Sequence, residues 1–475
     1  MIPTSKFMRY RLFITFIALT ILLCGTTVEA QTDDVQNRIK QLEGQVQTIL
    51  AELNKLKAEN PAPVKTDLPV ASATPEKKPE AEKKTGGIEL GNGMRVVPYG
   101  TIFVNFFGND AGTNNADIPL FAATSGKGNT NASVRQTRFG IRLEGAKVGN
   151  AKVTGVLETD FYGGSPAISI GENFGVVRLR LANVKLDWKN TSVTIGQDWI
   201  PFAPNSPVSI ADAAIPQFAA AGNNWARLPQ IKLEQRSENG KLVWQGAVLA
   251  PQTGDSNATA NFLQQPNSGA LSRLPFVQTR IAFVEKNWFG TKKPGSIGAS
   301  AHYGRSRVAS TSAPIAEQDV DSNGVAIDWN FPLHKRISWS GEAFSGRNLG
   351  GFQAGVFQSY NTDYAVSQNS ILVAQGVKGI RTNGGWTQLG FTPKLAEDRL
   401  TFYGSIGLDD PENDDLVNLR SRDFRSRNLA WAFDAIYKLT PQLQVGLEFR
   451  RLNTTYLISG TKRANHLNLG AAYSF

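Results

Sequence analysis

From Met94 to the last residue the sequence alternates between apolar and polar residues with a period of two, and this alternation limits the possible folds more than any other feature. Such a period places successive side chains on opposite faces of a β-strand. The final segment shows it most clearly, with apolar or aromatic residues on one face and small or polar residues on the other: Leu467, Leu469, Ala471, Tyr473 and Phe475 against His466, Asn468, Gly470, Ala472 and Ser474. We therefore expect an all-β fold.

The connections between these segments predict how the strands are arranged. Sixteen strands are expected near residues 95–107, 133–146, 150–161, 173–188, 191–199, 226–236, 241–250, 274–286, 296–307, 323–331, 335–347, 376–392, 398–409, 427–438, 442–452 and 464–475. Every second connection is short and the others are mostly long, which is typical of an outer-membrane barrel with tight periplasmic turns and long outer loops. A soluble sandwich also alternates, so the loop pattern decides. We expect a transmembrane antiparallel β-barrel of about 16 strands over residues 94–475.

Residues 1–30 have the layout of a secretory signal peptide. A basic start is followed by an apolar run from Leu12 to Leu23, and Val28-Glu29-Ala30 supplies small residues for cleavage. The alternative, a membrane anchor, is disfavoured because the apolar run is short. The single cysteine, Cys24, lies in this signal, so we expect no disulfide in the mature chain.

Residues 31–59 are expected to form a short periplasmic coiled coil, because their apolar residues are spaced alternately by four and three. The seam consists of Val35, Ile39, Leu42, Val46, Ile49, Leu53 and Leu56. Three heptads are marginal alone, so the helix needs support from another interface. A solitary amphipathic helix is the alternative. Residues 60–93 are rich in Pro, Lys and Glu and are expected to be a linker without a core.

The third long connection, from Ile200 to Trp225, differs in composition from the others. It is rich in proline and alanine, and its candidate constriction residues are Pro201, Phe202, Pro204, Asp212 and Phe218. A barrel of sixteen strands encloses an aqueous lumen rather than a packed core. Because an apolar loop is poorly suited to bulk water, we expect it to fold into the lumen and narrow it.

Charged residues within the strands are expected to face the lumen, because lipid-facing positions must be apolar or aromatic. The candidate pore-lining arginines are Arg138, Arg142, Arg178, Arg180, Arg280 and Arg336. Arginine suits anion guidance, since its fixed charge and planar fork bind carboxylate or phosphate at any pH. The alternative is that these arginines only pair with lumen acids as a scaffold. The net charge of +10 in an exported chain indicates anionic solutes or lipopolysaccharide rather than nucleic acid.

Three stretches resemble the DcaP-like trimeric outer-membrane porins: Arg135-Gln136-Thr137-Arg138-Phe139-Gly140, Ile195-Gly196-Gln197-Asp198-Trp199 and Arg227-Leu228-Pro229-Gln230-Ile231. The terminal Tyr473-Ser474-Phe475 is similar to the signal read by the barrel-assembly machinery. The resemblance implies a homotrimer that takes up small, often anionic solutes. It does not extend to most of the long loops.

The residues needed for catalysis or metal binding do not form a recognisable pattern. The three histidines, His302, His334 and His466, lie on well-separated segments, with no zinc spacing and no P-loop. We therefore expect no enzyme, cofactor or metal. The expected function is passive diffusion of small hydrophilic, anionic solutes through the bacterial outer membrane. The alternatives are an anchor or adhesin with a plugged barrel, and a sugar-selective porin.

Overall fold

The structure, a computed structural model, describes residues 87–91, 93–164, 167–168, 172–173, 175–253, 255, 266–308, 317–367 and 369–475. The chain divides into two compact units, Met1–Thr66 and Asp67–Phe475, and every described residue belongs to the second. The expected signal peptide, the coiled-coil seam and the linker up to residue 86 therefore lie outside the described residues and stay predictions.

Antiparallel strands form a closed barrel with sixteen strand positions. One of these positions is shared by two consecutive strands, β3 and β4, which both pair with β2. The barrel strands are β2 (Met94–Thr113), β3 (Ala122–Ser133), β4 (Arg138–Val148), β5 (Ala151–Asp160), β8 (Arg178–Asp187), β9 (Thr191–Trp199), β10 (Arg227–Arg236), β11 (Leu242–Leu249), β12 (Phe276–Glu285), β13 (Gly295–Val308), β14 (Gln318–His334), β15 (Ile337–Arg347), β18 (Arg381–Phe391), β19 (Leu400–Pro411), β20 (Arg425–Lys438), β21 (Leu443–Tyr456) and β22 (Gly460–Ser474). The expected sixteen-strand antiparallel barrel is confirmed.

Smaller elements accompany the barrel in the described residues. They are β1 (Ile88–Gly91), which pairs with β2, the hairpins β6 (Ala167–Ile168) with β7 (Glu172–Asn173) and β16 (Tyr360–Val366) with β17 (Leu372–Gly379), and the short helices α3 (Ser268–Leu271), η1 (Trp288–Gly290), η2 (Gly350–Phe352), α4 (Ala354–Phe357), η3 (Leu395–Asp398) and α5 (Asn413–Leu416). No helix in this part of the chain is long and apolar enough to cross a membrane.

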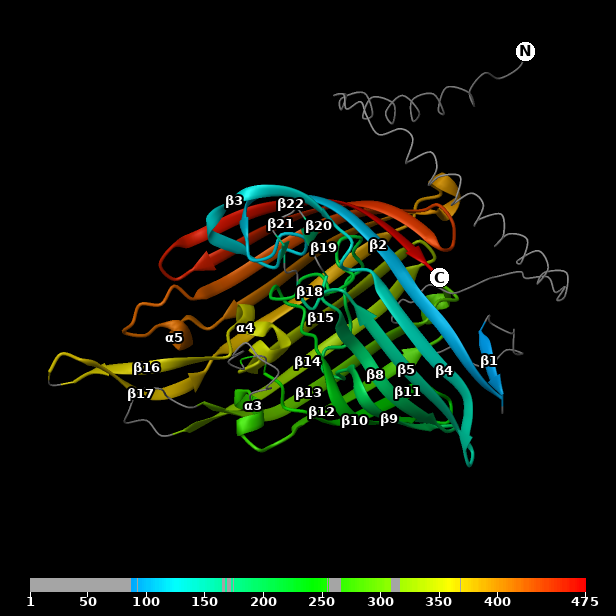
Figure 1. Cartoon of the computed structure of the whole chain (residues 1–475), viewed down its shortest axis with the longest axis horizontal. Coiled ribbons are helices and arrows are strands. Elements are labelled where there is room, and N and C mark those ends of the chain that lie inside the picture. Colours follow the sequence, from blue (N-terminus) through cyan, green and yellow to red (C-terminus); the bar gives the residue numbers. More distant parts are fainter. Residues whose placement is uncertain are drawn as a thin grey trace, which may run out of the picture. The chain divides into compact units, whose positions relative to one another are not determined.

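The barrel closes where its first strand meets its last. Strand β22 pairs with β2 over nine residue pairs, from Thr101 opposite Ser474 to Asn109 opposite His466. The two strands lie side by side, blue beside red, in Figure 1. The terminal residue extends the pairing, because the backbone groups of Phe475 and Gly100 exchange two hydrogen bonds of 3.1 Å. The chain end is thus fixed within the wall.

The alternation in the sequence corresponds to the two faces of the wall. On β14, Val325 and Ile327 point away from the barrel axis and are exposed, whereas Asp328 points inward and is buried. On β2 and β22, Phe106 and Leu469 face outward, while inward-facing polar residues are buried. Apolar side chains therefore cover the outside, and polar side chains line an interior that other parts of the chain occupy.

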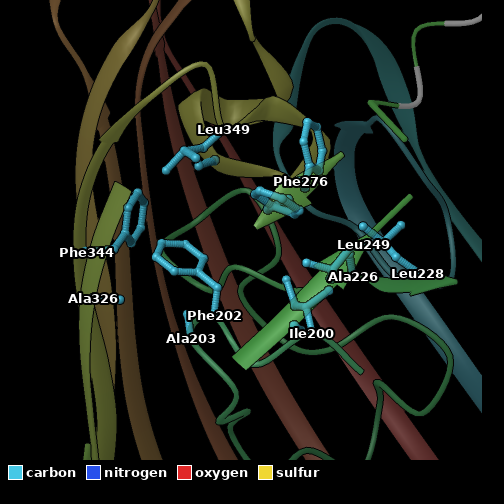
Figure 2. Packing of buried hydrophobic residues seen from close by; sticks show 13 residues of the cluster. Ile200, Phe202, Ala203, Ala226, Leu228, Leu249, Phe276, Ala326, Phe344 and Leu349 are labelled. Carbon is cyan, nitrogen blue, oxygen red and sulfur yellow. The ribbon is translucent and has the colours of Figure 1, made fainter. Parts of the chain in front are cut away.

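Three connections fill part of the interior: residues 114–121, residues 200–226 and residues 348–359. One cluster joins Phe202 and Ile200 of the second connection to Leu349 of the third and to Phe276 and Phe344 of the wall (Figure 2). The first connection contributes Ile118 and Leu120 to another cluster. Burial of these apolar side chains stabilises the inserted connections against the inner wall.

Candidate functional site

Residues 200–226 connect β9 to β10, and we call them the inserted loop. They form hydrogen bonds with several strands along the inner wall of the barrel. The first residues of the inserted loop bind the neighbouring side of the wall. The Phe202 N–H donates to Gln278 Oε1 on β12 at 3.2 Å, and the Ala203 N–H donates to Ser300 Oγ on β13 at 3.2 Å. Both buried N–H groups, those of Phe202 and Ala203, therefore have a side-chain hydrogen-bond partner.

The middle of the inserted loop is held by three inward-facing carboxylates. Glu342 on β15 accepts the Asn205 N–H at 2.5 Å, Asp434 on β20 accepts the Ile210 N–H at 3.1 Å, and Glu448 on β21 accepts the Ser209 hydroxyl. Carboxyl oxygens are hydrogen-bond acceptors that can satisfy buried N–H and O–H groups. The acids on this side of the wall therefore hold the inserted loop by accepting hydrogen bonds from N–H and O–H groups of the loop.

The next residues of the inserted loop turn their carbonyl groups toward arginines on the opposite side. The Ala213 carbonyl accepts from Arg138 at 2.9 Å, and the Ala214 carbonyl accepts from Arg178 at 2.8 Å, Arg180 at 3.4 Å and Arg227 at 3.3 Å. Gln136 adds to this side, since its Oε1 accepts the Ala213 N–H at 2.7 Å and the Ala214 N–H at 3.0 Å. The basic side of the wall therefore holds the inserted loop mainly through hydrogen bonds to the carbonyl groups of the loop.

The arginines of this basic side are paired with acids on β5. Arg178 lies 2.6 Å from Asp160, Arg180 lies 2.7 Å from both Glu158 and Asp160, and Arg138 lies 3.6 Å from Glu158. Together with Arg227, four guanidinium groups thus face two carboxylates. This part of the wall therefore carries a net positive charge. The ion pairs also agree with the alternative prediction, in which the arginines act as a scaffold by pairing with acids of the lumen.

Arg227 is a member of this cluster that the sequence analysis did not single out as a site residue. Its guanidinium lies over the rings of Trp199 and Trp225, at 5.0 and 5.1 Å from the centroids. Its Nη1 is buried without a hydrogen-bond partner. The available signal was its position at the start of the Arg227-Leu228-Pro229-Gln230-Ile231 stretch, directly after the inserted loop.

The remaining candidate arginines occupy different places. Arg142 is 46% exposed and lies 3.5 Å from Glu144, so it faces water inside the barrel. Arg280 is paired with Asp328 at 2.6 Å on the inner wall. Arg336 belongs to the turn between β14 and β15 and not to a strand; it donates to the Thr392 carbonyl at 3.0 Å and pairs with Asp398. The prediction that Arg336 lies in the strand near 335–347 is wrong, because that strand, β15, begins only at Ile337.

The candidate residues of the inserted loop are also distributed unevenly. Phe202 and Phe218 are buried in two separate apolar clusters, and Pro201 is buried beside the first. Pro204 is exposed. The Asp212 side chain is buried and forms an ion pair with Arg450 on β21. Only part of the predicted set therefore faces open space inside the barrel.

Arg450 is the cation on which the acidic side of the wall depends. It pairs with Asp212 of the inserted loop and with Glu448 at 2.5 Å, and its Nη1 donates to the Pro119 carbonyl at 3.2 Å. The side chains of Arg450, Asp212 and Glu448 are all buried. Arg450 thus connects the loop, the wall and residues 114–121. Within the described residues, no group of three His, Cys, Asp or Glu side chains is arranged to hold a metal ion.

Residues 114–121 are fixed by an ion pair outside the barrel strands. Arg135 donates to Asp117 Oδ1 at 2.5 Å, and its guanidinium lies over the Tyr162 ring at 3.9 Å. Burial opposes ionisation of the Asp117 carboxyl, but the hydrogen bonds and charge of Arg135 outweigh it and hold the pKa below its usual 3.8. The pair stays ionised at neutral pH.

Comparison with solved structures shows the fold of this barrel. The outer membrane channel DcaP of Acinetobacter baumannii is similar, with 20% identity and a TM-score of 0.60 over 82% of this chain and 99% of that chain. An anion-selective porin from Comamonas acidovorans has 12% identity and a TM-score of 0.49 over 80% of this chain and 100% of that chain. No family model and no curated protein matches the sequence. The resemblance to DcaP seen in the sequence is thus confirmed at the level of the fold.

Proposed function

We propose that the chain is an outer-membrane porin through which small hydrophilic solutes diffuse passively, without a chemical reaction. The observation that carries this proposal is a closed barrel with an apolar outside, a charged inside and a connection fixed along the inner wall. An outward apolar face suits lipid and a polar inward face suits water. The inserted loop then sets the width of the path.

The proposed preference for anions rests on the exposure of the basic side. The side chains of Arg142, Arg138 and Arg178 are 46%, 25% and 25% exposed, whereas those of Asp434 and Glu448 are fully buried. Exposed charges act on a passing solute more than buried charges that are already hydrogen-bonded. Anions should therefore enter more readily than cations.

We propose further that the protein is a homotrimer with its short turns and its N-terminal coiled coil in the periplasm. The resemblance to DcaP-like porins and the heptad seam support this arrangement. Phe475 supports recognition by the barrel-assembly machinery, because it ends the last strand and is 41% exposed. Lipopolysaccharide is the expected lipid around the long loops.

A plugged barrel that serves as an anchor or adhesin is the second candidate, and a specific observation favours it. The three inserted connections pack into apolar clusters inside the barrel, including Phe202 with Phe276 and Trp225 with Ile118. Packed apolar groups exclude water. A sugar-selective porin remains a further alternative, for which aromatic side chains along the path would be needed.

Planar-bilayer recording of the purified protein under a salt gradient tests these candidates. A porin should give stepwise conductance in groups of three, with a reversal potential toward anion selectivity. Conductance with cation selectivity would support the porin and contradict the proposed preference for anions that rests on the arginines. A folded, inserted barrel without conductance would overturn the porin and support the plugged anchor.

A further inference from the structure

Aromatic side chains gather on the outside of the barrel where β12–β15 meet their short turns. We call this group the aromatic platform; it consists of Phe283, Trp288, Phe289, Trp329, Phe331 and Trp339. Trp288 of the turn stacks on Phe331 of β14 with ring centroids 5.1 Å apart, and Trp339 lies 5.7 Å from Phe331. The turn between β12 and β13 therefore folds back onto the outer wall.

Two glycines make this packing possible. A Cβ atom on Gly295 would lie 2.8 Å from the Trp288 ring, and a Cβ atom on Gly341 would lie 2.3 Å from the Trp329 ring. Both separations are shorter than atoms tolerate, so any larger residue would displace the indole. The wall is thus shaped locally to seat two tryptophans.

Phe289 extends the aromatic platform into the surroundings. It is 70% exposed, and its φ of 50° lies in the left-handed region, which bulky residues rarely adopt. A strained backbone that presents an apolar ring to the exterior is costly in water. The cost is removed where the ring enters the interface between lipid tails and headgroups, where aromatic residues are enriched.

Lysines lie in the two turns that adjoin the aromatic platform. Lys286, Lys292, Lys293 and Lys335 are exposed, and none has an ion pair within the described residues. Their neighbour Lys241 differs, because it pairs with Glu285 at 2.6 Å. Lys293 donates to the Lys335 carbonyl at 2.8 Å, which joins the two turns. These turns thus carry several positive charges that the protein does not neutralise.

We propose that the aromatic platform and these lysines form a binding site for the headgroup of an anionic phospholipid. The inference rests on the proposed position of the barrel in a membrane with its short turns in the periplasm. The rings anchor the glycerol and upper acyl region, and the ammonium groups neutralise the phosphate, since basic residues next to a bilayer attract anionic lipid. The site lies on the outer wall and takes no part in solute passage.

The test is retention of lipid by the purified barrel in an equimolar mixture of phosphatidylglycerol and phosphatidylcholine, followed by native mass spectrometry. The wild type should retain phosphatidylglycerol preferentially. The triple variant Lys286→Gln, Lys292→Gln, Lys335→Gln should lose the preference, by about fivefold for each lysine. Phe289→Ser should weaken retention of both lipids, because the ring contributes contact area and no charge.

A matched control removes three exposed charges elsewhere, with Lys147→Gln at the end of β4 and with Lys189→Gln and Lys394→Gln in two other short turns. This control should keep the preference for phosphatidylglycerol. Equal loss in both triple variants would show a general charge effect and overturn the site, as would an unchanged preference in the first variant. Both variants should conduct as the wild type does. Absence of conductance in every protein would refute the porin proposal while the lipid result stands.

Discussion

The two halves of the inner wall hold the same loop with opposite chemistry. On β12–β21 the inward charged residues are mostly acids, Asp328, Glu342, Asp409, Asp434 and Glu448, with the arginines Arg280 and Arg450, and the five acids are buried. On β4–β10 arginines predominate around the loop and several remain partly exposed. The acidic half accepts from loop N–H groups, and the basic half donates to loop carbonyls.

This difference explains how one wall combines a fixed loop with a charged path. A backbone segment that crosses between two walls presents donors to one side and acceptors to the other, so acids and arginines satisfy both without additional side chains. These acids are buried, and each accepts a hydrogen bond or pairs with an arginine, so they act as structure. The partly exposed arginines keep some influence on solutes. The comparison therefore assigns stability mainly to the acidic half and selectivity to the basic half.

The largest expected effect comes from the acidic half. Arg450→Met leaves Asp212 and Glu448 buried without their cation, and loss of one partner from a buried pair costs about 3–5 kcal/mol. Urea unfolding in lipid vesicles should show this loss, and channel recordings should show noisier, larger conductance as the loop loosens. The control Arg451→Met changes an outward-facing arginine on the same strand. Equal stability of the two variants would contradict the structural role of the acidic half.

Removal of one arginine from the basic half should lower stability less and selectivity more. Arg178→Ser deletes a hydrogen bond to the Ala214 carbonyl and one ion pair of Asp160, worth about 1.5–3 kcal/mol because Arg180 remains 2.7 Å from Asp160. The reversal potential should move away from anion selectivity. An unchanged reversal potential would show that this half is only a scaffold and would abolish the distinction between the halves.

Much of the barrel could be predicted from the sequence, because strand alternation reports local geometry. The segment expected near 323–331 lies within β14, and the segment near 464–475 matches β22 up to Ser474. Inward residues such as Asp434 follow the predicted phase. Strand ends are less well determined by alternation. Arg336 was assigned to a strand but lies in a two-residue turn, where the period no longer applies.

The contacts of the site could not be predicted in the same way. The bond between Asn205 and Glu342 joins residues 137 positions apart, and no local pattern encodes which carboxylate meets which N–H. Arg227 was missed for a related reason. Its contacts with Ala214 and Trp225 depend on the path of the inserted loop, which no local pattern encodes. Composition indicated an unusual loop, whereas its partners depend on closure of the whole barrel.

A variant with a smaller expected effect should separate two roles of the basic half, the attraction of anions and the binding of the inserted loop. Arg142 is exposed and does not bind the inserted loop, and exposed pairs such as Arg142 with Glu144 contribute about 0–1 kcal/mol. Arg142→Ser should therefore leave unfolding almost unchanged and reduce anion preference slightly in bilayer recordings. Glu144→Gln is the matched control and should shift the reversal potential the opposite way. Shifts of the same sign would show that local structure, not charge, governs the measurement.

The smallest effect concerns residues 114–121, which the basic half holds through Arg135 and Asp117. Because the folded pKa of Asp117 lies below 3.8, its contribution is present above that pH and is lost as the pH falls through the folded pKa. Protection of these amides against hydrogen exchange, relative to the intrinsic rate at each pH, should fall in that acidic range and stay high at neutral pH. Asp117→Asn should show low protection at both. If acid left protection in the wild type unchanged, the ion pair would not hold this connection, and the apolar contacts of Ile118 and Leu120 would be sufficient.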